Sequence, residues 1–122
     1  MKKNEIEERS LDFAIRIVKM YQYLCSEKKE YVLSKQVLRS GTSIGAMVRE
    51  AEHGESKADF IHKMSIALKE AYETDYWLIL MKRTGFLTEK QFLEIEGDMK
   101  VIIRMLIAIV KSAKQKDNAD GS

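Results

Sequence analysis

The sequence predicts an all-α protein that folds as an antiparallel, up-down-up-down four-helix bundle. Proline is absent from the 122 residues and there are only six glycines, so long helices can continue without a break. Apolar residues recur three and four positions apart in four segments, which is the period of an amphipathic helix. The connections between these segments are short, which favours antiparallel neighbours. A three-helix fold with one arm is the structural alternative.

The four helices are expected in a single domain that spans residues 1–122. They are placed at about residues 10–27, 35–53, 57–84 and 89–114, and a polar tail over 115–122 is expected to be disordered. The fourth helix has the cleanest apolar stripe, with Leu106 at its centre. The first helix has two parallel stripes, one from Leu11 to Cys25 and one from Phe13 to Leu24. Cys25 is expected to pack in the core as a small apolar residue.

Short polar residues mark where the helices begin, and glycines mark two of the ends. The expected N-caps are Ser34, Ser56 and Thr88. Thr88 forms a capping box with Gln91, three residues later. Gly54 is expected to end the second helix in the left-handed conformation, and Gly85 to close the third helix.

The most unusual stretch is Arg39 to Ala46, where small residues fill the interior of a helix. A glycine inside a helix costs about 1 kcal/mol relative to alanine. Gly41 and Gly45 lie one turn apart and clear one face, which indicates close approach of a neighbouring backbone within the subunit or from another subunit. The residues of this helix-packing signature are Arg39, Ser40, Gly41, Ser43, Gly45 and Ala46.

This signature and the residues after it resemble the 23S rRNA intervening-sequence proteins, also called four-helix-bundle proteins. The later matching segments are Arg49-Glu50-Ala51, Asp59-Phe60-Ile61, Lys69-Glu70-Ala71, Glu73-Thr74 and Tyr76-Trp77-Leu78. The resemblance covers roughly residues 10–113. One departure is Met47, where members usually carry Asn.

The resemblance implies a bacterial four-helix bundle that assembles as a homopentamer. The family is also similar to the accessory protein of diversity-generating retroelements, a basic pentameric barrel that binds nucleic acid and a reverse transcriptase. No catalytic residues carry over from this resemblance.

Nothing in the sequence resembles a catalytic set, so we expect a protein that is not an enzyme and has no cofactor. Two histidines and one cysteine are a thin supply for acid–base or nucleophilic chemistry. The nearest approach to a metal site is Glu50 to His53, a Glu-x-x-His pattern, with Asp59 to His62 similar in form. At the end of the bundle where these histidines are expected, the fourth helix supplies Lys111 and Lys114. A di-iron bundle needs carboxylates there, so no metal is expected. The acidic residues of the third helix are expected in surface or interhelical ion pairs: Glu70, Glu73 and Asp75.

The start of the chain, Met1 to Glu5, has no apolar stretch behind it that could act as a secretion signal. The longest apolar run is Met105 to Val110, far short of the roughly 20 residues that span a bilayer. A single cysteine is typical of a reducing compartment. We therefore expect a cytoplasmic protein without membrane contact.

The fourth helix predicts a homo-oligomer. Only Arg104 is polar between Val101 and Val110. This apolar surface is about twice the ~100° stripe that one core requires. Oligomerisation through the first and fourth helices is therefore expected, and the resemblance makes five the best subunit count. The expected interface residues are Ile103, Met105, Ile107 and Val110.

The same helix carries a candidate nucleic-acid-binding ridge formed by Lys100, Arg104, Lys111 and Lys114. No acidic residue occurs between Val101 and Lys116, although the whole chain has a net charge of only +2. Such cations can hold the phosphates of RNA or DNA, or can simply oppose the helix dipole and keep the helix soluble. A protein-binding adaptor without nucleic-acid contact is therefore the alternative function.

Overall fold

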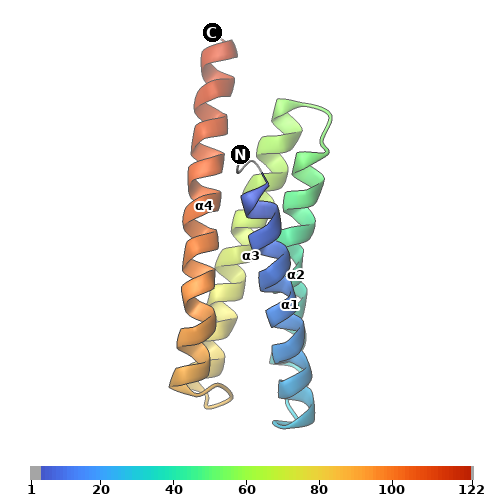
Figure 1. Ribbon diagram of the computed structural model, residues 1–122, viewed down its shortest axis with the longest axis vertical. Helices are drawn as coiled ribbons and strands as arrows, with labels where there is room; N and C mark the ends of the chain where they lie inside the picture. The colour runs from blue at the N-terminus through green and yellow to red at the C-terminus, as the bar shows by residue number, and fades with distance from the viewer. Residues whose placement is uncertain (1–3, 122) are drawn as a thin grey trace.

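The structure is a computed structural model that describes residues 4–121. Its four helices are α1 (Glu5–Ser26), α2 (Leu33–Glu52), α3 (Lys57–Arg83) and α4 (Glu89–Gly121). Figure 1 shows them running alternately up and down, with the C-terminal end of α4 projecting past the rest of the bundle. Contacts join α1 to α2, α2 to α3, α3 to α4 and α4 back to α1. The predicted four-helix bundle is confirmed, and the three-helix alternative is wrong.

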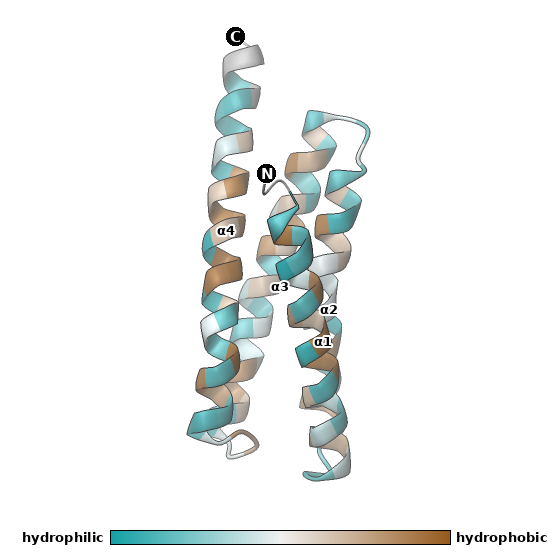
Figure 2. Cartoon of the chain, in the orientation of Figure 1, coloured by the Kyte–Doolittle hydropathy of each residue, from teal (hydrophilic) through white to brown (hydrophobic). Residues whose placement is uncertain are grey.

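The core forms where one apolar stripe from each helix meets the other three. The largest fully buried side chains are Phe13, Ile17 and Leu24 of α1, Val37, Ile44 and Val48 of α2, Met64, Leu78 and Met81 of α3, and Met99, Ile102 and Leu106 of α4. Figure 2 shows the hydrophobic residues of α4 within the bundle and a hydrophilic end beyond it. Among the described helices, none is both long and apolar enough to cross a membrane.

Only one of the two stripes predicted for α1 enters this core. In the other stripe Leu11 and Val18 are exposed by 56% and 38% of their surfaces, and Ile15 beside them is 47% exposed. Cys25, at the end of that stripe, is half-buried, and its Sγ lies 3.8 Å from Ser34 Oγ. The expected core position of Cys25 is therefore only partly realised.

Several predicted helix boundaries are confirmed by their hydrogen bonds. The backbone N–H of Thr88 donates to Gln91 Oε1 at 2.9 Å, and the N–H of Gln91 donates to Thr88 Oγ1 at 3.1 Å. This is the predicted capping box. The N–H of Asp59 donates to Ser56 Oγ at 3.0 Å. Gly85 is left-handed, with φ of 87°, and follows the end of α3.

The predicted N-cap at Ser34 is wrong, because the carboxylate of Glu30 takes that role. The backbone N–H groups of Val32, Leu33 and Ser34 donate to it at 3.0, 2.9 and 2.7 Å. Burial alone would raise the pKa of Glu30, but these hydrogen bonds outweigh burial and lower it. A carboxylate placed just before the helix satisfies three free donors and favourably faces the positive end of the helix dipole. Helix α2 consequently begins earlier than predicted.

Two other expectations at helix ends are corrected. Gly54 is not left-handed, since Gly85 is the glycine with positive φ in the described chain. A Cβ at Gly54 would displace the terminal carboxylate of Asp59 and would lie 3.2 Å from the carbonyl oxygen of Ala51. The tail predicted to be disordered from residue 115 continues α4 as far as Gly121. Ser122 and residues 1–3 of the predicted N-terminal start lie outside the described residues.

Candidate functional site

The glycines of the helix-packing signature allow α1 and α2 to approach closely. A Cβ added to Gly41 would lie 2.9 Å from both Cγ1 and Cγ2 of Ile17. A Cβ added to Gly45 would lie 3.4 Å from Ser10 Oγ. The predicted close approach is therefore confirmed within the subunit, against α1.

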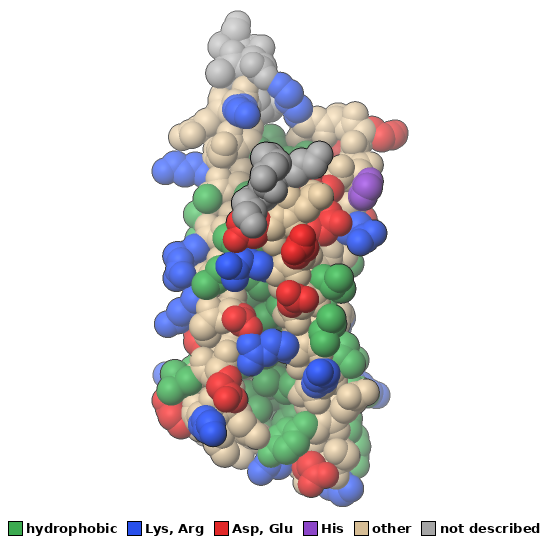
Figure 3. All heavy atoms as spheres, in the orientation of Figure 1, with side chains coloured by type: hydrophobic (Ala, Val, Ile, Leu, Met, Phe, Trp, Pro, Cys, Tyr) green, Lys and Arg blue, Asp and Glu red, His purple; other side chains and the backbone are tan. Residues whose placement is uncertain are grey.

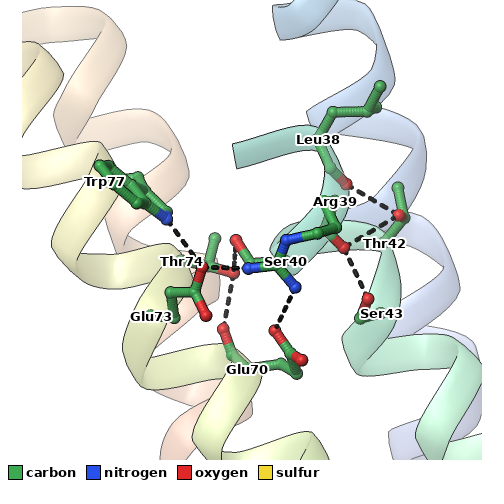
Figure 4. Close-up of polar contacts among 9 residues, drawn as sticks. All are labelled: Leu38, Arg39, Ser40, Thr42, Ser43, Glu70, Glu73, Thr74 and Trp77. Carbon is green, nitrogen blue, oxygen red and sulfur yellow. Dashed lines mark hydrogen bonds and ion pairs between the residues drawn. The ribbon is translucent and has the colours of Figure 1, made fainter. Parts of the chain in front are cut away.

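The other side of the signature is a polar seam between α2 and α3 (Figure 4). The guanidinium of Arg39 donates to Glu70 Oε1 at 3.2 Å and also pairs with Glu73. The indole N–H of Trp77 donates to Glu73 at 3.0 Å. This hydrogen bond lowers the pKa of Glu73, burial opposes the shift, and Arg39 lowers the pKa further. The interhelical ion pairs predicted for Glu70 and Glu73 are thus confirmed.

Hydroxyl groups complete this seam below the ion pairs. The buried hydroxyls of Ser40 and Thr74 are hydrogen-bonded to each other at 2.9 Å. The hydroxyl of Ser43 donates to the carbonyl oxygen of Arg39 at 2.6 Å (Figure 4). Because each of these groups already has a partner, the signature holds the register of two helices and leaves no free nucleophile.

A pair of carboxyl groups, Asp75 of α3 and Glu96 of α4, meets inside the bundle. Glu96 is only 8% exposed. Burial and a hydrogen bond to Asp75 raise the pKa of Glu96 to about 7. Asp75 Oδ1 and Glu96 Oε1 otherwise lack hydrogen-bond partners among the described residues, which is consistent with a proton held between the two groups. The ion pair predicted for Asp75 is therefore corrected to a carboxyl pair.

This carboxyl pair was not predicted from the sequence, although the position of Glu96 on its helix is one signal for it. Glu96 follows Ile95 and lies one turn after Phe92, so it falls at the edge of the buried stripe of α4. Its partner could not be found in the same way, because the register between α3 and α4 is a tertiary property.

The histidines of the two Glu-x-x-His-like patterns lie exposed near the connection between α2 and α3. His62 borders a groove of about 490 Å³, together with Lys114 from α4. An ammonium group beside His62 disfavours a bound cation there. Within the part of the chain that the structure describes, no group of three or more His, Cys, Asp or Glu side chains is placed to hold a metal ion.

The four cations of the predicted ridge, Lys100, Arg104, Lys111 and Lys114, are all exposed on α4. Among the side chains that the structure describes, none of them takes part in an ion pair, although the charge of Lys100 acts on Glu96 and opposes the rise of its pKa. Figure 3 shows basic side chains along the outer edge of α4 and acidic side chains over the N-terminal half of α1. No acidic residue lies on α4 between Val101 and Lys116, so the ridge is locally basic although the whole chain is nearly neutral.

The predicted oligomer interface on α4 is mostly used within the bundle itself. Val110 is only 8% exposed and belongs to the core, so its assignment to the interface is corrected. Ile103 and Met105 are half-buried against the core, and Ile107 is exposed by 41%. The reason is that α4 packs against both α3 and α1, which together cover more of its circumference than a single stripe.

A cluster of exposed aliphatic side chains lies on α1. Leu11, Ile15 and Val18 form the aliphatic stripe, one helical turn or less apart. Beside it runs a groove of about 360 Å³ between α1 and α2. This groove is lined by Glu7, Glu8, Leu11, Ala14, Thr42, Gly45, Ala46 and Arg49. Small side chains and an aliphatic rim make this surface able to receive apolar side chains.

The antiparallel arrangement and its small-residue seam place the chain in the class of four-helix-bundle proteins. It belongs to the 23S rRNA-intervening sequence protein family, whose sequence model matches residues 2–108. A protein with unknown function from the S23 ribosomal protein family of Bacteroides thetaiotaomicron VPI-5482 has a solved structure with 55% sequence identity and a TM-score of 0.86. The match covers 87% of this chain and 98% of that one. No functionally curated protein matches the chain. The resemblance predicted from the sequence is confirmed.

Proposed function

We propose that this chain is a non-enzymatic, homo-oligomeric protein that associates with nucleic acid in the cytoplasm. The observation that carries the proposal is the ridge of unpaired cations on α4. The acidic residue two positions before Lys100, Asp98, is already engaged, because it pairs with Arg16 across the α1–α4 contact. An unopposed row of cations attracts a polyanion even when the net charge of the whole chain is small.

The arrangement of reactive groups supports a role without catalysis. Cys25 lies near the connection between α1 and α2, whereas His53 and His62 flank the connection between α2 and α3. Because adjacent helices are antiparallel, these two connections are at opposite ends of the bundle. The thiol and the imidazoles are therefore too far apart to act as a nucleophile and its base.

The aliphatic stripe of α1 supports assembly from several copies of this chain, and five is the count that the family resemblance implies. A contiguous exposed apolar surface is unfavourable on a monomer and is typical of a protein interface. Two isoleucines of similar exposure test which helix is used: Ile15 on α1 at 47% and Ile107 on α4 at 41%.

We expect Ile15→Glu to lower the mass measured by light scattering and Ile107→Glu to leave it unchanged. Loss of assembly only in Ile107→Glu would return the interface to the α4 residues that the sequence predicted and would exclude α1, which the sequence also predicted. A monomeric mass of the unmodified protein at micromolar concentration would refute the oligomer.

Nucleic-acid association is tested by reversing two charges of the ridge, Arg104→Glu with Lys111→Glu. Binding of fluorescein-labelled RNA and DNA, followed by anisotropy at low salt, should weaken at least tenfold. A matched double reversal at Lys19 and Lys28, which are exposed elsewhere, should change the affinity less than threefold. Light scattering of both variants establishes that the assembly is intact.

Salt gives a second, independent criterion. If four phosphates are contacted, affinity for a single strand should fall roughly 50-fold between 50 and 200 mM salt. Little sequence preference is expected, because phosphate contacts position a nucleic acid without specifying its bases. Absence of binding by the unmodified protein would contradict the proposal and favour the protein-binding adaptor.

A further inference from the structure

Two tyrosines on the outer face of α3 are exposed. Tyr72 and Tyr76 expose 51% and 59% of their surfaces. They lie four residues apart, so both are on one face of the helix, about 6 Å apart along its axis. The ring of Tyr76 meets the ring of half-buried Trp77 edge to face, with centroids 5.1 Å apart. Because Trp77 is in turn held by Glu73, the position of Tyr76 is supported by the seam between α2 and α3.

The charges around these tyrosines are basic. Lys69 and Arg83 share the outer face of α3 with them and are exposed. The carboxylates of this part of α3 all point elsewhere. Glu70 and Glu73 pair with Arg39 of α2, and Asp75 meets Glu96 of α4. The outer face of α3 between Phe60 and Arg83 therefore presents cations and aromatic rings without a free carboxylate.

The cationic ridge of α4 begins at the level of this face. The contact between Asp75 and Glu96 fixes which residues of the two helices lie at the same level. Helices α3 and α4 are antiparallel. Tyr72 lies about one turn before Asp75, and Lys100 lies about one turn after Glu96, so both are displaced from the carboxyl pair toward the same end of the bundle. Lys100, the first cation of the ridge, is therefore level with Tyr72.

We propose that Tyr72 and Tyr76 are a stacking platform for unpaired bases, and that the nucleic acid bound by this chain is single-stranded. This inference rests on the proposed nucleic-acid association and specifies its ligand. Exposed aromatic rings beside a cationic groove are the combination that binds single strands: the rings stack on bases, and the cations hold the backbone. In a duplex the bases are stacked on each other and their faces are not available.

The aliphatic stripe of α1 differs from this surface in chemistry, which is why the two surfaces are assigned different occupants. Leu11, Ile15 and Val18 are aliphatic, and their groove is bordered by Glu8 and by Glu7, whose charge is paired with that of Arg49. Carboxylates repel a polyanion, whereas the cations around the tyrosines attract one.

The experiment compares a fluorescein-labelled 20-nucleotide oligouridine with a 20-base-pair RNA duplex, using anisotropy at 50 mM salt. We expect Tyr72→Leu with Tyr76→Leu to weaken binding of the single strand at least tenfold, given the usual contribution of base–aromatic stacking. Affinity for the duplex should change less than twofold. The corresponding phenylalanine pair keeps the rings and should keep the affinity. Tyr31, which is 53% exposed near the connection between α1 and α2, provides the control Tyr31→Leu.

Three results would overturn the inference. An unchanged single-strand affinity in the leucine pair, with binding still weakened by Arg104→Glu with Lys111→Glu, would rule out the stacking platform but not the cationic ridge. An altered mass of the leucine pair by light scattering would assign the tyrosines to a protein contact. Failure of the unmodified protein to bind either RNA would contradict the proposed function as well.

Discussion

The same substitution, glycine to alanine, should change the stability of this protein in opposite directions at two positions. Gly97 lies in the interior of α4, more than two turns from its start, and a Cβ there would meet nothing within 4 Å. Gly97→Ala should therefore stabilise the protein by about 0.5–1 kcal/mol, because alanine is the better helix former. The substitution Gly41→Ala brings the same gain in helix propensity, but its added Cβ would face Ile17 of α1.

The cost at Gly41 follows from the contact distances. The added Cβ would lie 2.9 Å from two carbons of Ile17, whereas carbon atoms prefer roughly 3.5–4 Å. Ile17 is fully buried and β-branched, so it has little freedom to rotate away. Overpacking of this kind costs about 1–3 kcal/mol, against a gain of about 1 kcal/mol in propensity. Gly41→Ala should thus be destabilising by up to about 2 kcal/mol.

Urea unfolding followed by circular dichroism measures both variants, at one protein concentration because assembly affects apparent stability. Gly45→Ala provides the intermediate case, since its Cβ would make an ordinary 3.4 Å contact, and should be neutral or mildly stabilising. If Gly41→Ala were as stable as Gly97→Ala, then α1 would not approach α2 as closely as the structure places it.

Three further predictions concern the core, the carboxyl pair and the histidines. Leu106→Ala removes a fully buried side chain and should cost about 2–5 kcal/mol in the free energy of unfolding; a loss below about 1 kcal/mol would mean that α4 is misplaced. With its pKa raised from 4.5 to about 7, Glu96 binds its proton more tightly in the folded than in the unfolded chain, so stability should fall as pH rises through this interval. Glu96→Gln should remove that fall and be about 1–2 kcal/mol more stable at pH 8, after allowance for solvent screening; an unchanged pH profile would contradict a shared proton. Replacing His53 and His62 by alanine should leave unfolding and oligomeric mass unchanged, and stoichiometric metal in protein purified without added metal would refute this expectation.

The sequence by itself determined the helices and several of their ends, because the interactions responsible are local. Apolar residues three and four apart define a helix face wherever they occur, and the capping box of Thr88 with Gln91 spans only three residues. The signature glycines also indicated close packing correctly. Their cost inside a helix is a property of the chain, although periodicity did not say which helix would approach.

The tertiary structure decided which of several compatible surfaces is buried. Both stripes of α1 have helical spacing, and only the positions of α2 and α4 place Phe13 in the core and leave Leu11 outside. The apolar breadth of α4 predicted an interface at Val110, but packing against two neighbours buried that residue within the subunit. Hydrophobic burial is non-directional, so the sequence specifies only how much apolar surface must be covered. The arrangement of the helices decides which neighbouring residues cover it.

The meeting of Asp75 with Glu96 depended on tertiary structure most of all. Their side chains are brought together by the register of two antiparallel helices, and a shift of one turn would separate them by about 5.4 Å along the axis. No local pattern encodes that register. It results from the packing of the whole core, which is why the sequence could place each carboxylate on its helix but not pair the two.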